Sequence, residues 1–529
     1  MLFTSYCFIG FLIVLFLLYY KIPGKYQWGL LLIASYLFYA VAGAQFLIYI
    51  GVTTLSTWYA GLRMEKVKQQ YTGYRKLHKA EMTKEEKKSH KQEEKKKQRI
   101  WLLLCLFFNF GILAVVKYTN FAISNINYFL NLAGRGPLNF LSLALPMGIS
   151  FYTFQSMGYL IDVYRGTCEP ERNLGKFALF VSFFPQLIQG PISRFADLSK
   201  TLWIPHAFDK KQVIFGIERI LWGFFKKLVI ADRIVAGVNT IIRDPDQYQG
   251  VYVLVGMLFY ACELYADFTG GIDITIGVAQ VLGIKIKENF ERPYFSKSIK
   301  EYWRRWHITM GTWFTDYIFY PISVSMPMLR LSKFSRAKFG EAVGKRVPVY
   351  CATILVWFTT GIWHGASWNF IVWGLMNCLV IMVSQEMEPF YRWFHSKFSV
   401  KDRWLFRAFQ VGRTILLMSA LRMFDCYRDV PLTFRMFGNM LTGRNYSVLF
   451  QGGLMNIGLT AADYMVLSIG VVTMLAVSLV QRKGSVREAL YAKSPAVQLG
   501  VVYLLLFSVL IFGAYGIGYD ASQFIYNQF

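Results

Sequence analysis

Long apolar runs alternate with short polar segments along nearly the whole chain. Many runs have the length at which a helix crosses a bilayer, and they lack the strict two-residue alternation typical of half-buried strands. The pattern therefore predicts an all-α polytopic membrane protein of about 11–13 hydrophobic helices, not all of which need to cross. The expected spans lie near 4–20, 27–42, 46–62, 100–116, 118–131, 138–161, 213–241, 250–282, 349–364, 367–385, 405–424, 463–480 and 497–514.

The composition supports one membrane domain over residues 1–529 rather than several soluble domains. Hydrophobic residues make up 55% of the chain and aromatic residues 18%, and many Trp and Tyr stand at the edges of the apolar runs. Such edges are where interfacial aromatic belts form. The first run, 6–20, has no basic residue before it and no small-residue cleavage site after it. We expect it to be a retained helix rather than a signal peptide.

The formal net charge of +26 is concentrated in a few polar segments. The segment 63–99, inserted within the membrane domain, holds 14 Lys and Arg against 6 Glu, and smaller basic clusters occupy 330–346 and 482–493. Basic segments beside apolar runs are typical of the cytoplasmic face, which places both termini outside the cytoplasm. We expect 63–99 to be a charged, solvated helix or a flexible segment. Its lysines are not interleaved with aromatic residues, which argues against a nucleic-acid partner.

The seven cysteines form no Cys-x-x-Cys pair, and most of them fall inside apolar runs. This distribution predicts neither a disulfide framework nor a metal site.

His364 is a single titratable residue between two apolar runs, in the sequence Trp363-His364-Gly365-Ala366-Ser367-Trp368-Asn369. An imidazole at membrane depth costs free energy unless it is hydrogen-bonded or lines a polar cavity. The position of His364 therefore predicts a functional site. The alternative is a structural histidine that ties two helices together.

A second unusual segment, 183–195, carries Pro185, Gly190 and Pro191 inside an apolar stretch. Broken backbone at membrane depth is tolerated only where protein or a water-filled cavity satisfies its polar groups. We predict either a re-entrant element that lines a pocket or an interfacial loop.

The segment Tyr302-Trp303-Arg304-Arg305-Trp306-His307 mixes aromatic and basic side chains. On one helix, Trp303, Trp306 and His307 would share a face, with Arg304 and Arg305 directed elsewhere. One hypothesis is that His307 faces a cavity while the two arginines bind donor phosphates. An in-plane interfacial helix is the alternative.

Four motifs together resemble the membrane-bound O-acyltransferase (MBOAT) family, in its bacterial branch of alginate O-acetyltransferase and D-alanyl-teichoic-acid transfer proteins. They cover 186–195, 265–277, 302–307 and 363–369, in family order. The resemblance implies the MBOAT fold, a bacterial plasma-membrane location and acyl transfer. The chain departs from the alginate pattern at Thr315-Asp316-Tyr317 and at Thr269-Gly270-Gly271-Ile272-Asp273. These differences leave open which polysaccharide accepts the acyl group.

The resemblance also implies roles for individual residues. His364 matches the family's catalytic histidine, and His307 matches its second active-site polar residue. A neutral imidazole suits the removal of a hydroxyl proton during attack on a thioester, so direct transfer with His364 as general base is the economical mechanism. Asp267 and Asp273 either order this network or pin helices together. The expected substrate-binding or tunnel residues are Trp303, Arg304, Arg305, Trp306, Asp267, Gln186, Gly190, Pro191, Trp363 and Asn369.

The main hypothesis is transfer of an acetyl group from a cytoplasmic thioester to an extracytoplasmic polysaccharide pathway. The donor would be acetyl-CoA or an acyl-carrier protein, without a permanently bound cofactor or metal. By family analogy, the acceptor would be a partner transferase of the serine-esterase (SGNH) type. The alternatives are D-alanyl transfer to teichoic acid and, from another class, a polar-solute transporter.

Donor and acceptor on opposite sides of a membrane can meet only along a polar path through the hydrocarbon. We therefore expect a central tunnel with His364 and His307 facing each other across its middle. Arg304 and Arg305 would lie toward the cytoplasmic mouth, and 186–194 would form part of the wall.

Overall fold

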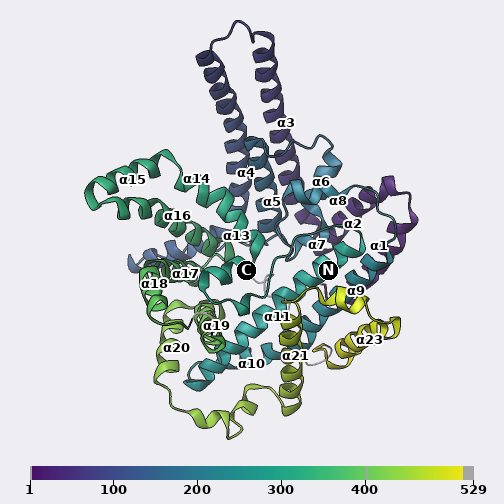
Figure 1. The fold of residues 1–529 in the computed structure, drawn as a ribbon, viewed down its shortest axis with the longest axis vertical. Coiled ribbons are helices and arrows are strands. Elements are labelled where there is room, and N and C mark those ends of the chain that lie inside the picture. The colour runs from purple at the N-terminus through teal and green to yellow at the C-terminus, as the bar shows by residue number, and fades with distance from the viewer. Residues whose placement is uncertain (1–2, 401–402, 516–529) are drawn as a thin grey trace. The chain divides into compact units, whose positions relative to one another are not determined.

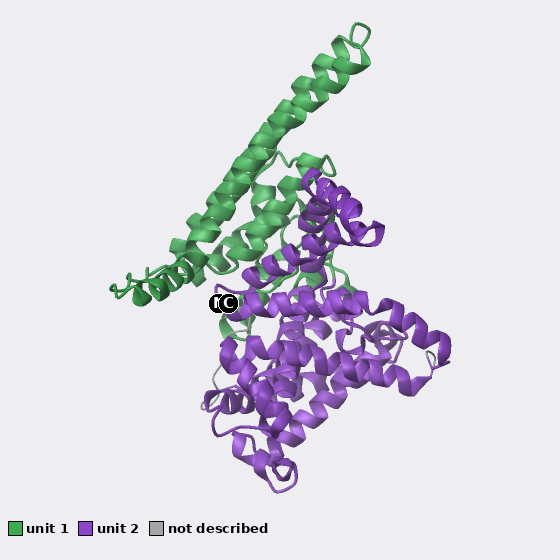
Figure 2. Cartoon of the chain, turned by 90° about the vertical axis from the view of Figure 1, so that its left-hand side faces the viewer, with its two compact units in different colours: residues 1–213, 278–287 green, residues 214–277, 288–529 purple. Residues whose placement is uncertain are grey.

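The computed structural model of the protein describes residues 3–400 and 403–515, and the regular elements among them are helices, with no strand (Figure 1). The all-α fold expected from the apolar pattern is confirmed. The chain divides into two compact units, one of residues 1–213 with 278–287 and one of 214–277 with 288–529 (Figure 2). The single membrane domain expected from the sequence remains a prediction.

The first unit contains a long helical hairpin formed by α3 and α4. The side chain of Thr83 accepts from the Glu86 N–H while Glu86 accepts from the Thr83 N–H, so a capping box starts α4. Farther along, Arg75 and Glu94 join the two arms at 2.6 Å. The helices of this unit are α1 (Tyr6–Lys21), α2 (Gln27–Ala42), α3 (Leu47–Leu77), α4 (Lys84–Leu132), α5 (Ile149–Arg165), α6 (Leu174–Ser182), α7 (Phe184–Leu187) and α8 (Phe195–Leu202).

The Lys-rich segment 63–99 is thus helical on both sides of its turn, as the first of the two alternatives predicted. Helix α4 runs without a break from this charged stretch through the apolar stretch that follows. The two spans expected at 100–116 and 118–131 are therefore parts of one helix. The expected span at 138–161 contains helix only from Ile149 onward.

The broken segment 183–193 lies buried within the first unit. The side-chain amide of Gln186 donates to the Pro191 carbonyl at 3.3 Å and to the Ser193 hydroxyl. The Pro191 carbonyl of the broken backbone thus finds a partner inside the protein, as irregular structure at membrane depth requires.

The second unit holds both histidine motifs and most of the remaining helices. Its helices α9 and α11 approach closely because glycines face each other at two levels, Gly216 with Gly277 and Gly223 with Gly270. The helices of this unit are α9 (Lys210–Phe224), a π-helix (Phe225–Ala231), α10 (Asp232–Arg243), α11 (Val251–Val281), α12 (Ile299–Arg305), α13 (Ile308–Phe314), a second π-helix (Thr315–Phe319), α14 (Tyr320–Ser323), α15 (Met326–Phe339), α16 (Glu341–His364), α17 (Trp368–Glu386), α18 (Glu388–Lys397), α19 (Trp404–Tyr427), α20 (Val430–Thr442), α21 (Ala461–Val480), α22 (Val486–Tyr491) and α23 (Pro495–Phe512).

Within the described residues, six helices are long and apolar enough to cross a membrane: α4, α11, α16, α17, α21 and α23. Taken together, Gly24–Ala42 and Ala44–Leu77 are also long and apolar enough to cross a membrane, but the two parts meet at a bend of 120°. The other expected spans are helices that are short, broken or charged. The span at 213–241 is interrupted by the π-helix with Lys226 and Lys227, and α19 carries three arginines.

Candidate functional site

His364 is the last residue of α16, and it is buried. Two glycines bring α16 against α17 there, because a side chain at Gly361 or Gly374 would meet backbone atoms of the opposite helix at 2.5 or 2.4 Å. The chain then turns through Gly365 and Ser367 into α17. The motif therefore fixes the imidazole at a tight corner between two helices.

His307 occupies a break between α12 and α13 rather than a helical position. Its φ of 49° lies in the left-handed region, which non-glycine residues seldom adopt and which concentrates at functional sites. The prediction that Trp303, Trp306 and His307 share one helical face is thus wrong, because α12 ends at Arg305 and Trp306 caps it in an extended conformation. An antiparallel bridge between Phe290 and Trp306 holds the break.

Asn289 fixes the position of His307 from the neighbouring segment. Its side-chain nitrogen lies 3.3 Å from Nδ1 of His307. Its side-chain oxygen accepts from the Thr309 N–H at 3.0 Å and from the Thr309 hydroxyl at 2.9 Å. Sequence reasoning missed Asn289, since nothing in its local pattern marks it.

Aromatic rings join the two histidines into one buried cluster. The Trp363 ring lies 5.8 Å from the His307 ring and 5.2 Å from the His364 ring, centroid to centroid. The Trp373 ring lies 4.7 Å from the His364 ring, and the Phe268 ring lies 5.0 Å from the His307 ring. The structure thus brings together the residues of the two motifs that the sequence singled out.

Arg422 of α19 is a further member of this cluster that sequence reasoning missed. Its guanidinium is buried and lies over three indole rings, at 5.7 Å from Trp303, 5.1 Å from Trp306 and 4.8 Å from Trp373. Buried cation–π contacts of this kind are worth about 2 kcal/mol or more each. The signal in the sequence was the presence of three arginines, Arg422 among them, in the largely apolar run of α19.

Burial, with the charge of Arg422 as the second cause, lowers the pKa of His307 to about 3. The imidazole is therefore neutral near pH 7. A neutral ring can both accept and donate a hydrogen bond, which suits a residue that orients a substrate or polarises a carbonyl group.

Other predicted site residues have different surroundings. Arg305 is bound to Glu301 at 2.7 Å, and Arg304 is exposed. Asn369 donates to the Phe424 carbonyl at 3.1 Å and so ties α17 to α19. Asp267 pairs with Lys227 at 2.5 Å in the interior. Gln186, Gly190 and Pro191 belong to the first unit, and their part in a tunnel wall remains a prediction.

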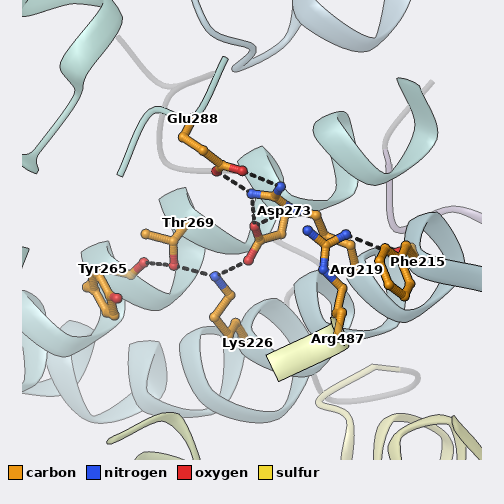
Figure 3. A network of polar contacts seen from close by, with 8 residues as sticks. All are labelled: Phe215, Arg219, Lys226, Tyr265, Thr269, Asp273, Glu288 and Arg487. Carbon is orange, nitrogen blue, oxygen red and sulfur yellow. Dashed lines mark hydrogen bonds and ion pairs between the residues drawn. The ribbon is translucent and has the colours of Figure 1, made fainter. Parts of the chain in front are cut away.

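A second polar cluster surrounds Asp273 (Figure 3). Arg219 contacts Asp273 at 2.8 Å and Glu288 at 2.5 Å. Lys226 lies 2.6 Å from Asp273 and donates to the Thr269 hydroxyl at 2.8 Å. These contacts join α9, the first π-helix and α11, which is the helix-pinning role considered for Asp273. No group of three or more His, Cys, Asp or Glu in the described residues has the arrangement of a metal site.

The tight corner at Gly365 yields a prediction for the site. A methyl group there would lie 2.2 Å from the Phe370 ring, which stacks beside His364 at 6.4 Å. We expect Gly365→Ala to displace the ring and the imidazole and to lower activity about 10²-fold, because small misplacements of reacting groups are costly. The measurement is product formation by purified protein at matched amounts, with Gly412→Ala as the control because its position on α19 is open. Unchanged activity in Gly365→Ala would contradict the placement of His364.

Comparison with known proteins identifies relatives of the chain. The model of the MBOAT, membrane-bound O-acyltransferase family, matches residues 171–426. A protein of Azotobacter vinelandii named "Probable alginate O-acetylase AlgI" is 36% identical over 390 residues, which cover 73% of this chain and 69% of that protein. The peptidoglycan O-acetyltransferase of Helicobacter pylori is 32% identical over 58% of this chain and 59% of its own. The teichoic acid D-alanyltransferase of Bacillus subtilis is 28% identical over 49% of this chain and 63% of its own.

Proposed function

Because the chain belongs to the membrane-bound O-acyltransferase family, we propose that it moves an acetyl group from a cytoplasmic thioester to an extracytoplasmic cell-surface polysaccharide. The chain is an O-acyltransferase of the membrane, and the acetyl group, the donor and the acceptor are the proposed parts. The observation that carries the proposal is the buried cluster in which Trp363 contacts both His307 and His364. Relatives named for O-acetylation of two different polysaccharides support the acetyl group.

The cluster suggests a direct transfer. His364 removes the proton of an acceptor hydroxyl as its oxygen attacks the thioester carbon. The carbon–sulfur bond breaks, and the proton passes from the imidazole to the leaving thiolate. His307, neutral because of its burial, orients the substrate or polarises the carbonyl oxygen. An ester and a free thiol are the products.

The donor is acetyl-CoA or an acyl-carrier protein, and the acceptor is the polysaccharide or a partner transferase of the SGNH type. D-alanyl transfer to teichoic acid is the second candidate function, favoured by the similarity to a teichoic acid D-alanyltransferase. A transporter no longer fits, because the family is one of acyltransferases.

The test is transfer of radiolabel from the two donor classes in membranes that contain the protein. Labelled acetyl-CoA should leave label in an alkali-labile ester on polysaccharide or on a partner protein. Label that enters the ester only from a D-alanyl carrier protein would replace the acetyl proposal with the second candidate. Absence of ester from both donors, in membranes where the protein is folded, would refute both.

The proposed orientation has its own test. If 63–99, 330–346 and 482–493 face the cytoplasm, a cysteine placed at Ala80 in the turn of the helical hairpin should resist a membrane-impermeant thiol reagent on intact cells. The same site should react after the cells are opened, and a Cys-free background serves as control. Labelling of intact cells at this position would overturn the orientation and the cytoplasmic donor.

A further inference from the structure

The second unit holds a cavity of about 470 Å³ beside the polar cluster around Asp273, and the cavity is open where its lining residue Leu504 is 68% exposed. A charged wall carries the ionic side chains drawn in Figure 3, which come from α9, the first π-helix, α11, α22 and, for Glu288, the segment after α11. Helices α21 and α23 contribute an apolar wall, which also carries the polar side chains of Thr473, Ser478 and Gln481. Its apolar residues are Met474, Val477, Val501, Leu504 and Leu505.

Helices α21 and α23, which both line the cavity, are long and apolar enough to cross a membrane. Helix α21 ends at Val480 and the basic segment 482–493 follows, so Arg487 lies in the polar connection between these two apolar helices. From α21 the cavity is lined by 473–481, which extend about 12 Å along the axis at 1.5 Å per residue. Its lining on α23, 501–505, begins about 9 Å from the start of that helix.

No occupant of a single chemical character suits both walls. Water alone would wet the leucine and valine side chains, and hydrocarbon alone would leave charged groups unsolvated. An empty space would forfeit the packing contacts that interiors normally have. An amphiphile with its polar end at the charged wall matches both walls.

The charged wall also selects the head group. It carries both signs: Arg219, Lys226, Arg292 and Arg487 as cations, and Glu218, Asp273, Glu288 and Glu291 as anions. Because Arg219 and Lys226 already form ion pairs with acids of the same wall, a ligand with a net charge would disturb that balance. A head group with one phosphate and one ammonium adds no net charge and offers a partner to each sign.

We propose that this cavity binds one phospholipid with a zwitterionic phosphoethanolamine head group and an acyl chain between α21 and α23. The site goes beyond the proposed acyl transfer, since this lipid is neither donor nor acceptor. It borders the histidine cluster, because Phe290 lines the cavity and its ring lies 5.0 Å from Trp306 and 6.4 Å from His307. The bound lipid therefore supports one wall of the catalytic cluster.

Native mass spectrometry of the full-length chain, purified in detergent and washed free of loosely bound lipid, tests the proposal. We expect one phosphatidylethanolamine to remain, and added phosphatidylethanolamine to bind at least tenfold more tightly than phosphatidylglycerol. Leu505→Trp, which fills the apolar wall, should weaken binding at least tenfold. Leu499→Trp, on the exposed side of the same helix, is the matched control and should bind as the original chain does.

Photocrosslinking of the unmodified chain keeps the test independent of mutant folding. Phosphatidylethanolamine with a photoreactive acyl chain should label peptides of α21 and α23. Label confined to other helices would overturn the site, as would unchanged binding by a folded Leu505→Trp. Equal retention of phosphatidylglycerol would overturn the zwitterionic head group. Ester formation, measured on the same samples, reports on the proposed function separately.

Discussion

Replacing His364 with alanine should abolish acyl transfer while the protein still folds and inserts. The imidazole is buried at the corner between α16 and α17, where it contacts Trp363 and Trp373. A positioned general base contributes about 10²–10⁴-fold to a rate, so ester formation should fall by at least about 10²-fold. The measurement is ester formed from labelled acetyl-CoA per amount of protein in the membrane.

His307→Ala provides the comparison that separates the two histidines. It should be severely impaired yet retain more activity than His364→Ala, because a supporting hydrogen bond contributes less than the base itself. Asn289→Ala should resemble a milder His307 variant, since Asn289 contacts Nδ1 of His307. Near-normal ester formation by His364→Ala would contradict the role of His364 as general base. Full activity of His307→Ala would favour the alternative in which the segment 302–307 is only an interfacial helix.

The second large effect should be on stability, at Lys227. Its ammonium group lies 2.5 Å from Asp267 and 2.7 Å from Asp232, and all three side chains are buried. Lys227→Met would leave two carboxylates in the interior without this cation, and breaking a buried pair in this way costs about 3–5 kcal/mol. The measurement is the free energy of unfolding in detergent or, where unfolding is irreversible, the thermal inactivation temperature.

Two further variants show whether charge is the cause of that loss. Adding Asp267→Asn to Lys227→Met should recover part of the stability, because one unpaired carboxylate is removed. Lys300→Met, at an exposed position of the same unit, should leave stability unchanged. Equal stability of Lys227→Met and the original chain would contradict a structural role for Asp267.

The sequence predicted the class of fold and the two central histidines for a clear physical reason. Titratable residues are rare in long apolar runs, so His364 stood out, and the Trp–Arg mixture marked the surroundings of His307. Apolar length alone could not separate a crossing helix from a broken or charged one. The run 213–241 therefore looked continuous although a π-helix interrupts it.

Long-range contacts were beyond the reach of the local pattern. Arg422 lies 58 residues after His364 along the chain, and only the packing of α19 brings it over Trp373. The break at His307 was also hidden, because its left-handed conformation depends on Asn289 and Phe290 from another segment. The sequence marked the two histidine motifs, while the residues that hold them in place came from the structure.

The turn of the helical hairpin in the first unit is a suitable place to insert a second protein domain. Residues 78–83 connect α3 and α4 outside the apolar part of either helix, the capping box starts α4, and the Arg75–Glu94 pair joins the two arms. Exposed turns of this kind accept insertions well. A small folded domain grafted between Lys79 and Met82 would be carried on two paired helices, and it would serve as an alignment marker for electron cryomicroscopy.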